Sequence, residues 1–416
     1  MLNQYVLNET TRNWIQKSPI NPITDSYICS LKDQGYRKAT IEIYIRCVAH
    51  FAYWLTPKKV PLKNINETTV ERFLFEHLPR CHCPMPCKRS LIDSRASLAH
   101  LLRLLRAKNV IPISSSYPSR WQQELMHYNN YLEEVCGLVE NTRFTRLHYA
   151  CEFLQCCFKR RPENINRLKP NDIHQFIQKY SKGYKAGTIQ VICSCVRRYL
   201  RYRAFCGDDT TKLIAAVPSV AQWRLSSIPK SLTPTDIERI LNTFDRTTQT
   251  GLRSYAIARC LIDLGLRASE VASIQLANVN WSEGILKING KGGREDLLPL
   301  PAKTGAAMVD YLRRGRPTTT SPALFVRHRA PFDQPIGPSI VRSAMRPAFI
   351  SCGVNPGLGT HILRHSVACQ MLSAGASLKE IADVLRHRSL DTSMIYTKID
   401  LQQLACVVAP WPRRLS

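Results

Sequence analysis

A group of basic and phenolic residues near the C-terminus has the residue types and spacing for chemistry on a phosphate. The group comprises His361, Arg364, His365, His387 and Tyr396. Thr360 is predicted to cap a helix whose first turns place the first three members at i, i+3 and i+4, on one face. A guanidinium binds phosphate oxygens in a bidentate manner, and a hydroxyl activated by nearby cations is a nucleophile. The pattern predicts a phosphate site with a covalent nucleophile.

The apolar residues of this helix are expected to form its buried side and leave the basic side chains to face a ligand. They are Ile362, Leu363, Val367, Ala368 and Met371. Residues 377–387 and 389–399 are predicted to form two further helices, the second of which carries Tyr396. Any one histidine or tyrosine is more often a packing residue, so the prediction depends on their joint occurrence.

With two upstream motifs, this group resembles the tyrosine recombinase (phage integrase) family. Residues 265–270 read Gly-Leu-Arg-Ala-Ser-Glu, similar to the family's first arginine motif, and Lys291 lies in a glycine-rich stretch that resembles the family's β-hairpin. The separations also fit, with 24 residues from Arg267 to Lys291, 23 from Arg364 to His387 and 9 from His387 to the tyrosine. The resemblance covers roughly the last 190 residues with specific motifs.

The resemblance implies a site-specific DNA recombinase or integrase. Arg267 and Arg364 would stabilise the charge that develops on the phosphate, and Lys291 would protonate the departing 5′ oxygen. We find no acidic cluster with the spacing of a two-metal site and no GxxxxGK[ST] loop. We therefore expect strand transfer without metal, ATP or another cofactor.

By the same resemblance, Tyr396 would be the nucleophile and would form a 3′-phosphotyrosine link with a free 5′ hydroxyl. His361 would be the general base or an orienting group, and His387 would hydrogen-bond the phosphate. Such enzymes act as homo- or hetero-tetramers on two sites in double-stranded DNA. A mobile element is the expected source, since an extra N-terminal unit enlarges the chain. A type IB topoisomerase and a catalytically idle DNA-binding protein are the alternatives.

One residue departs from the family pattern. The family usually has glycine immediately before the histidine that precedes the tyrosine, and this chain has Arg386. Glycine there would suit a helix C-terminus. We expect Arg386 either to alter that corner or to add a DNA contact.

The composition agrees with a nucleic-acid partner. Lys and Arg total 58 against 31 Asp and Glu, a formal charge of +27 with a pI near 9.7. A basic surface gains affinity for a polyanion by releasing condensed counterions, although a merely basic protein would show the same charge. The sequence has no apolar run of membrane-spanning length and no signal-peptide pattern, and its 16 cysteines lie scattered in helical patterns. We expect a cytoplasmic protein with reduced thiols and no membrane partner.

The expected fold is mainly α-helical with a small antiparallel β-sheet. Two SAM-like helical bundles would precede an integrase-type catalytic domain. The predicted boundaries are a lead-in over 1–20, a first helical DNA-binding or interaction domain over 21–115, a core-binding domain over 116–218, a linker over 219–232 and the catalytic domain over 233–416. Strands are predicted over 284–289 and 296–300, with Lys291 in the turn between them.

The two helical bundles are predicted to be a repeat. The corresponding residues are Thr40 and Phe51 with Thr142 and Phe153, and Val70, Phe73 and Leu74 with Ile173, Phe176 and Ile177. The last helix of the second bundle carries Arg197, Arg198, Arg201 and Arg203, with tyrosines interleaved. These arginines are predicted to bind the DNA backbone while the tyrosine rings pack against sugars. A solvated basic helix face is the alternative.

A short loop between helices contains Cys81, His82, Cys83 and Cys87 with two prolines. Three thiols and an imidazole could complete a tetrahedral zinc shell. The spacing is unlike that of common CxxC pairs, and the prolines restrict how the loop could wrap around an ion. We expect no metal here and keep zinc at Cys81, Cys83 and Cys87 as the alternative.

Overall fold

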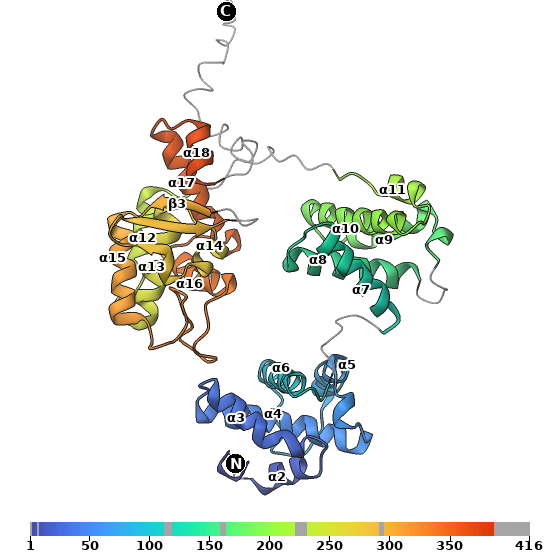
Figure 1. The fold of residues 1–416 in the computed structure, drawn as a ribbon. Coiled ribbons are helices and arrows are strands. Elements are labelled where there is room, and N and C mark those ends of the chain that lie inside the picture. The colour runs from blue at the N-terminus through green and yellow to red at the C-terminus, as the bar shows by residue number, and fades with distance from the viewer. Residues whose placement is uncertain are drawn as a thin grey trace, which may run out of the picture. The chain divides into compact units, whose positions relative to one another are not determined.

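The computed structural model describes residues 2–5, 8–111, 119–158, 164–220, 231–290 and 295–386 (Figure 1). Helices dominate these residues, and their one sheet has three short antiparallel strands, so the predicted fold class is confirmed. Contacts divide the chain into two compact units, residues 1–27 with 42–223 and residues 28–41 with 224–416. The domain boundaries drawn from the sequence stay a proposal. No described helix has the length and apolar character of a membrane span.

The first helical region, residues 8–111, follows a short helix α1 (Leu2–Tyr5). Its helices are α2 (Glu9–Gln16), α3 (Thr24–Asp33), α4 (Lys38–Leu55), α5 (Glu67–Glu71), the π-helical turn η4 (Arg72–His77) and α6 (Leu91–Ala107). Ser90 caps α6, because its hydroxyl accepts from the backbone N–H of Asp93. The Tyr27 hydroxyl of α3 donates to the Ser97 carbonyl of α6 across 3.0 Å. The sequence pattern predicts helices over 66–78 and 90–108, and both are confirmed, although the first continues as a π-helical turn.

The second helical region comprises residues 119–158 and 164–220. Its helices are α7 (Gln122–Asn130), the π-helical turn η7 (Tyr131–Val135), α8 (Glu140–Cys157), α9 (Pro170–Ser181), α10 (Ala186–Phe205) and α11 (Thr211–Ala216). Their apolar faces share one buried core that includes Tyr128, Phe153, Phe176 and Tyr199.

The structure supports the predicted repeat through equivalent contacts in the two regions. Helices α4 and α8 both have 18 residues. Phe51 meets Phe73 edge to face with ring centroids 5.1 Å apart, and Phe153 meets Phe176 in the same manner at 5.3 Å. All four rings are fully buried. Since aromatic pairs fix the packing distance and angle of their helices, the two regions share one packing scheme.

The C-terminal region comprises residues 231–290 and 295–386. Its helices are α12 (Pro234–Asn242), α13 (Gln249–Asp263), α14 (Ala268–Ser273), α15 (Ala302–Asp310) with the π-helical turn η10 (Tyr311–Gly315), α16 (Pro338–Ser351), α17 (His361–Ser373) and α18 (Leu378–Val384). The order Thr233-Pro234 predicts an N-cap followed by proline at the first helical position, and Thr233 does cap α12, where it also forms a capping box with Asp236. The strands β1 (Val279–Asn280), β2 (Ile285–Asn289) and β3 (Glu295–Pro299) pair in that order, with Asn289 opposite Glu295.

Two local predictions in this region are wrong. Thr360 stands at the N-cap position of α17, but its side chain makes no capping hydrogen bond because its backbone is already in the α-helical conformation. The sequence pattern also predicts a helix from about residue 253 to 264, but α13 begins at Gln249, since the Thr248 hydroxyl accepts from the backbone N–H of Gly251 and caps an earlier turn.

Gly265 joins α13 to α14 in a conformation that other residues resist. Its φ is +58°, and a Cβ atom added there would lie 2.6 Å from Cδ2 of Leu385. The left-handed conformation costs a non-glycine residue about 1–2 kcal/mol, and the close approach of a buried leucine adds overpacking to that cost. Gly284, with φ +64° and no atom within 4 Å of such a Cβ, offers a matched control.

We expect Gly265→Ala to lower the free energy of unfolding by more than about 2 kcal/mol and Gly284→Ala by about 1 kcal/mol. Urea unfolding of the two variants measures the difference. Equal losses would show that the contact with Leu385 does not constrain this turn.

Candidate active site

Arg364 is a deeply buried arginine of the candidate site. It lies on α17, one turn after His361, and only 5% of its surface is exposed. Its Nη1 donates to the Gly265 carbonyl at 2.6 Å, and its Nη2 donates to the Leu385 carbonyl. Arg364 is therefore held by carbonyl groups within the protein, as a buried guanidinium requires, and the expectation that it also faces a ligand stays a prediction.

Arg267 stands at the start of α14, two residues after Gly265. Its backbone N–H donates to Glu270 Oε2 at 2.9 Å, and its Nη1 donates to Glu270 Oε1 at 2.5 Å. Its Nη2 reaches the Arg386 carbonyl at 3.5 Å. The side chain is 32% exposed, so it is fixed by Glu270 and still reaches the surface.

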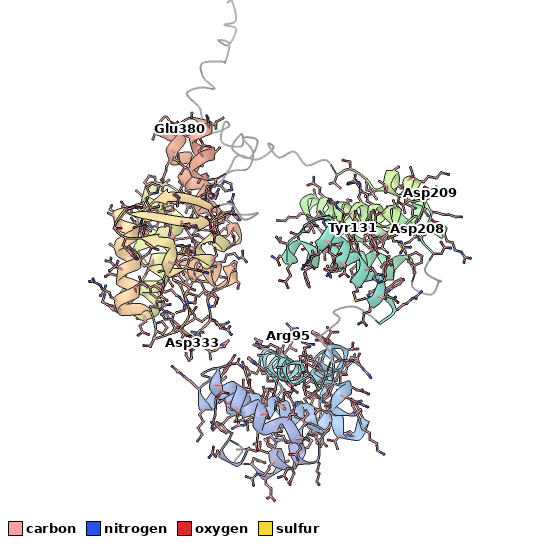
Figure 2. The ribbon with its side chains drawn as sticks, viewed as in Figure 1. Arg95, Tyr131, Asp208, Asp209, Asp333 and Glu380 are labelled. Atoms are coloured by element: carbon pink, nitrogen blue, oxygen red, sulfur yellow. The ribbon has the colours of Figure 1, made fainter. Side chains whose placement is uncertain are left out.

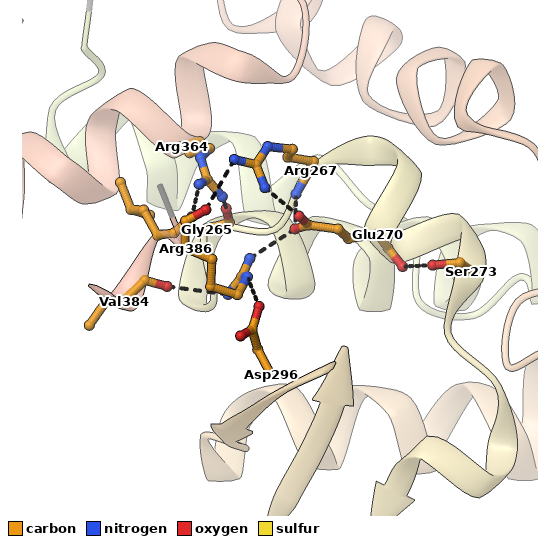
Figure 3. A network of polar contacts seen from close by, with 9 residues as sticks. Gly265, Arg267, Glu270, Ser273, Asp296, Arg364, Val384 and Arg386 are labelled. Carbon is orange, nitrogen blue, oxygen red and sulfur yellow. Dashed lines mark hydrogen bonds and ion pairs between the residues drawn. The ribbon is translucent and has the colours of Figure 1, made fainter. Parts of the chain in front are cut away.

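The two arginines, distant in the sequence, converge on consecutive peptide groups. Arg364 donates to the Leu385 carbonyl and Arg267 to the Arg386 carbonyl, at the end of α18. Figure 3 shows the guanidinium groups side by side above this corner. The arrangement concentrates fixed positive charge directly before His387 in the chain, as a phosphate site requires.

Glu270 links this pair to Arg386. Its carboxylate is 4% exposed and also accepts from Arg386 Nη2 at 2.8 Å, while Arg386 Nε lies 4.0 Å from Asp296 Oδ2 on β3 (Figure 3). Arg386 itself has a φ of +53°, the conformation for which glycine is preferred at a helix end. Its side chain is 7% exposed and has an internal partner in Glu270, so Arg386 keeps the helix-end conformation and adds an ion pair. The expected DNA contact of Arg386 stays a prediction.

Charge interactions shift the pKa values of two groups in the site. Burial on its own raises the pKa of the Glu270 carboxyl, but the backbone N–H of Arg267 and the guanidiniums of Arg386 and Arg267 bring it below its ordinary value. The pKa of the His361 imidazole is lowered by partial burial and by the charges of Arg364, Arg267 and Arg342. A neutral imidazole is the form that can accept a proton.

The structure thus brings together three of the six predicted catalytic residues, namely Arg267, His361 and Arg364. Lys291, His387 and Tyr396 lie outside the described residues. The strands on either side of Lys291 pair as predicted, up to Asn289 and Glu295. The sequence did not identify Glu270 and Asp296 as the acidic partners of the arginines in this site. The only available signal was the position of Glu270 three residues after Arg267, which is the spacing of a capping box.

The predicted DNA-binding helix α10 uses several arginine donors internally. Arg197 Nη2 donates to the Val217 carbonyl at 3.1 Å, and Arg198 Nη1 reaches Cys136 Sγ at 3.8 Å. Arg203 pairs with Glu124 and with Asp208, which Figure 2 labels at the end of this helix. Arg201 is exposed.

The expectation that the interleaved tyrosines pack against DNA sugars is wrong. Tyr199 and Tyr202 are buried in the core of the second helical region. The Tyr199 hydroxyl donates to Glu124 at 2.7 Å. Large aromatic rings on the inner face of a helix bury more apolar surface in the protein core than they would against a DNA groove.

The helical C-terminal region, with its small sheet and two converging arginines, defines a phosphoryl-transfer domain of the DNA strand-transferase class. The profile of the phage integrase family matches residues 230–403. The putative integrase/recombinase y4rA of Sinorhizobium fredii is 35% identical over 386 residues, 92% of this chain and 92% of that protein. The tyrosine recombinase XerA of Pyrococcus furiosus is 27% identical over 281 residues, 67% of this chain and 91% of XerA.

A solved structure shows the same fold. The XerH site-specific recombinase bound to a palindromic difH substrate matches with a TM-score of 0.53 and 16% identity, over 88% of this chain and 94% of XerH. The chain therefore belongs to the phage integrase family of tyrosine recombinases. Members of this family are DNA strand-transferring enzymes that need neither ATP nor a metal, and site-specific DNA recombination is the activity of the family.

Glu270→Gln tests the buried carboxylate. The folded-state pKa of Glu270 lies below its ordinary value of 4.5, so its charge stabilises the fold above that pH and loses this effect as pH falls through the folded-state pKa. We expect the variant to lose about 2 kcal/mol of unfolding free energy at pH 7. The difference from the wild type should shrink below pH 4.5.

Urea unfolding at pH 7 and below pH 4.5 measures this effect. Glu283→Gln is the control, because Glu283 is exposed and bonds only Asn280 among the contacts described for it. The control should stay within about 0.5 kcal/mol of the wild type. A Glu270→Gln deficit that is independent of pH would contradict the assigned charge interactions.

Proposed function

We propose that this protein is a site-specific recombinase of a mobile element, which cuts and rejoins DNA through a 3′-phosphotyrosine intermediate. The observation that carries the proposal is the convergence of Arg267 and Arg364 on the Leu385–Arg386 corner, one residue before His387. A site that held its arginines apart could not stabilise one phosphate. The relationship to the putative integrase/recombinase y4rA supports the integration role.

In the proposed reaction, the Tyr396 oxygen attacks the scissile phosphorus, and the bond from phosphorus to the 5′ oxygen breaks. Arg267 and Arg364 stabilise the charge on the non-bridging oxygens. His361 takes up the proton of the phenol, and Lys291 gives a proton to the departing 5′ oxygen. The phosphodiester energy stays in the tyrosyl link, so the reverse attack by a 5′ hydroxyl rejoins DNA without ATP.

Internal bonds hold the arginines before substrate arrives. The Arg267 guanidinium is bonded to Glu270, which is in turn bonded to Arg386, so its orientation does not depend on DNA. Preorganised charge costs no reorganisation at the moment of reaction, and the loss of one preorganised donor typically slows an enzyme by roughly 10²–10³-fold. The fixed geometry is the physical support for an active rather than an idle site.

The partner is double-stranded DNA, and the proposed assembly is a tetramer on two DNA sites. XerH, which shares the fold, was solved on its difH DNA substrate. The formal charge of +27 favours a DNA partner through counterion release. We propose that both helical regions contact the duplex, with the boundaries at residues 21–115 and 116–218.

Tyr396→Phe should leave duplex binding within a few-fold of the wild type and abolish covalent attachment to a nicked suicide substrate. The reason is that only the hydroxyl oxygen can form the phosphotyrosyl bond. Denaturing electrophoresis of labelled DNA measures the adduct. The exposed Tyr184 of the second helical region provides the control, since Tyr184→Phe should form adduct at the wild-type rate. A covalent adduct from Tyr396→Phe would assign the nucleophile elsewhere.

Arg201→Ala and Arg203→Ala separate DNA contact from internal structure on one helix. Arg201 is exposed, and its replacement should weaken DNA binding and lower the slope of log K against log salt by roughly 0.9 while leaving stability unchanged. Arg203 pairs with Glu124 and Asp208, so its replacement should lower the unfolding midpoint. Salt titrations of binding and thermal unfolding measure the two effects. An unchanged salt slope for Arg201→Ala would remove α10 from the DNA interface.

A further inference from the structure

Four potential metal ligands meet in the first helical region, far in the chain from the catalytic residues. They are His50 of α4, His77 at the end of η4, and Cys81 and Cys83 of the following loop, and their ligand atoms all lie within 4.8 Å of one another. His50 and Cys81 are buried, while His77 and Cys83 are partly exposed. The zinc alternative of the sequence analysis, with Cys81, Cys83 and Cys87, is therefore wrong in its membership. Cys87 Sγ instead donates to the Cys83 carbonyl at 3.4 Å, and His82 is exposed.

Three of the six separations between these atoms are close to those of a tetrahedral shell. The Nε2 atoms of His50 and His77 are 3.4 Å apart, Cys81 Sγ is 3.2 Å from His50 Nε2, and Cys83 Sγ is 3.4 Å from His77 Nε2. With Zn–N near 2.0–2.1 Å and Zn–S near 2.3 Å, tetrahedral angles place two nitrogens about 3.4 Å apart and a nitrogen and a sulfur about 3.6 Å apart. These three pairs thus already lie near ligand-to-ligand distances, and the other pairs lie within 4.8 Å.

The hydrogen bonding around His50 selects the tautomer that a metal needs. His50 Nδ1 lies 2.9 Å from the Lys88 carbonyl oxygen, which can only accept, so Nδ1 carries the proton and Nε2 carries a lone pair. Two polar atoms, Cys81 Sγ and His77 Nε2, approach this Nε2. One lone pair cannot serve two donors well, whereas a cation at the centre satisfies all the groups at once. Metal-bound histidines commonly donate their other N–H to a carbonyl in this way.

The repeat provides an internal comparison. By the correspondence of Phe51 with Phe153 and of Phe73 with Phe176, His50 and His77 correspond to Glu152 and Tyr180. In the second helical region, the Tyr180 hydroxyl donates directly to Glu152 Oε2 at 2.6 Å. The same two positions thus form a self-sufficient hydrogen bond in one copy and a pair of imidazoles beside two thiols in the other.

The backbone differs between the copies at the same place. The segment that ends in His77 is π-helical, whereas its counterpart belongs to the regular helix α9. Such π-helical turns are rare and occur frequently at functional sites. Here the turn directs His77 toward His50, so a local change in the helix serves the cluster.

From this cluster we infer that His50, His77, Cys81 and Cys83 bind one structural zinc ion in the first helical region. Two thiolates neutralise the charge of Zn²⁺, which suits a partly buried site, and mixed sulfur and imidazole ligands select zinc among the common divalent ions. Four protein ligands leave no open position, so the ion holds α4, η4 and the loop together rather than catalysing a reaction. His77 and Cys83 line a surface cavity of about 800 Å³, which gives the ion a route to the site.

The test measures zinc in the full-length protein. Plasma mass spectrometry after dialysis should find roughly one zinc per chain. The double variant Cys81→Ser, Cys83→Ser should lose the ion by more than about tenfold. The matched controls Cys87→Ser and His82→Ala change the same loop outside the cluster and should retain it. Wild-type protein without stoichiometric zinc, or controls that lose zinc as the double variant does, would overturn the inference.

A second measurement uses wild-type protein, so its result does not depend on whether a variant folds. Wild-type protein exchanged with Co²⁺ should show the visible absorption of tetrahedral cobalt with a thiolate charge-transfer band, and chelation should lower its melting temperature. The spectrum of octahedral cobalt, or no spectral change on adding Co²⁺, would mean that the cluster is only a hydrogen-bonded group of thiols and imidazoles.

Discussion

The buried guanidinium of Arg364 is the constraint on which the rest of the C-terminal region depends. A guanidinium is always charged, and each of its donors must find an acceptor when water is excluded. Two of these acceptors are the carbonyls of Gly265 and Leu385, so α17 can pack only where the α13–α14 turn and the end of α18 meet it. Gly265 is required in this turn by its positive φ and by the approach of Leu385. The same bonds bring Arg267 beside the corner that leads to His387.

Glu270 offsets the repulsion between the positive charges of this site. Three arginines around one phosphate site would repel one another, and the buried carboxylate contacts two of them. Arg386, which stands where the family usually has glycine, accepts a positive φ and offsets this cost with its ion pair to Glu270. Arg386 therefore belongs to an internal network of charged groups. This network explains how a bulky residue can occupy a helix-end position.

The sequence allowed the fold class to be predicted and singled out Arg267, His361 and Arg364, which the structure brings together, because helical periodicity and short motifs are local signals. It did not indicate what each arginine would contact. Arg203 and Arg201 are two residues apart, yet one pairs with carboxylates and the other is exposed. For the same reason the cysteine loop suggested Cys87 as a ligand, while the structure supplies His50 and His77 from neighbouring elements. The spacing of residues along one segment does not indicate which distant residues their side chains contact in the folded protein.

In the proposed reaction, Arg364 acts through a fixed fork of donors rather than through charge alone. Arg364→Lys keeps the charge but cannot bridge two carbonyls and a phosphate together. Single-turnover formation of the covalent adduct on a nicked substrate, at saturating DNA and well below the unfolding temperature of the variant, tests this most directly. We expect Arg364→Lys to form the covalent adduct roughly 10²–10³-fold more slowly than the wild type, with its DNA affinity nearly unchanged. A lysine variant that forms adduct at the wild-type rate would contradict it.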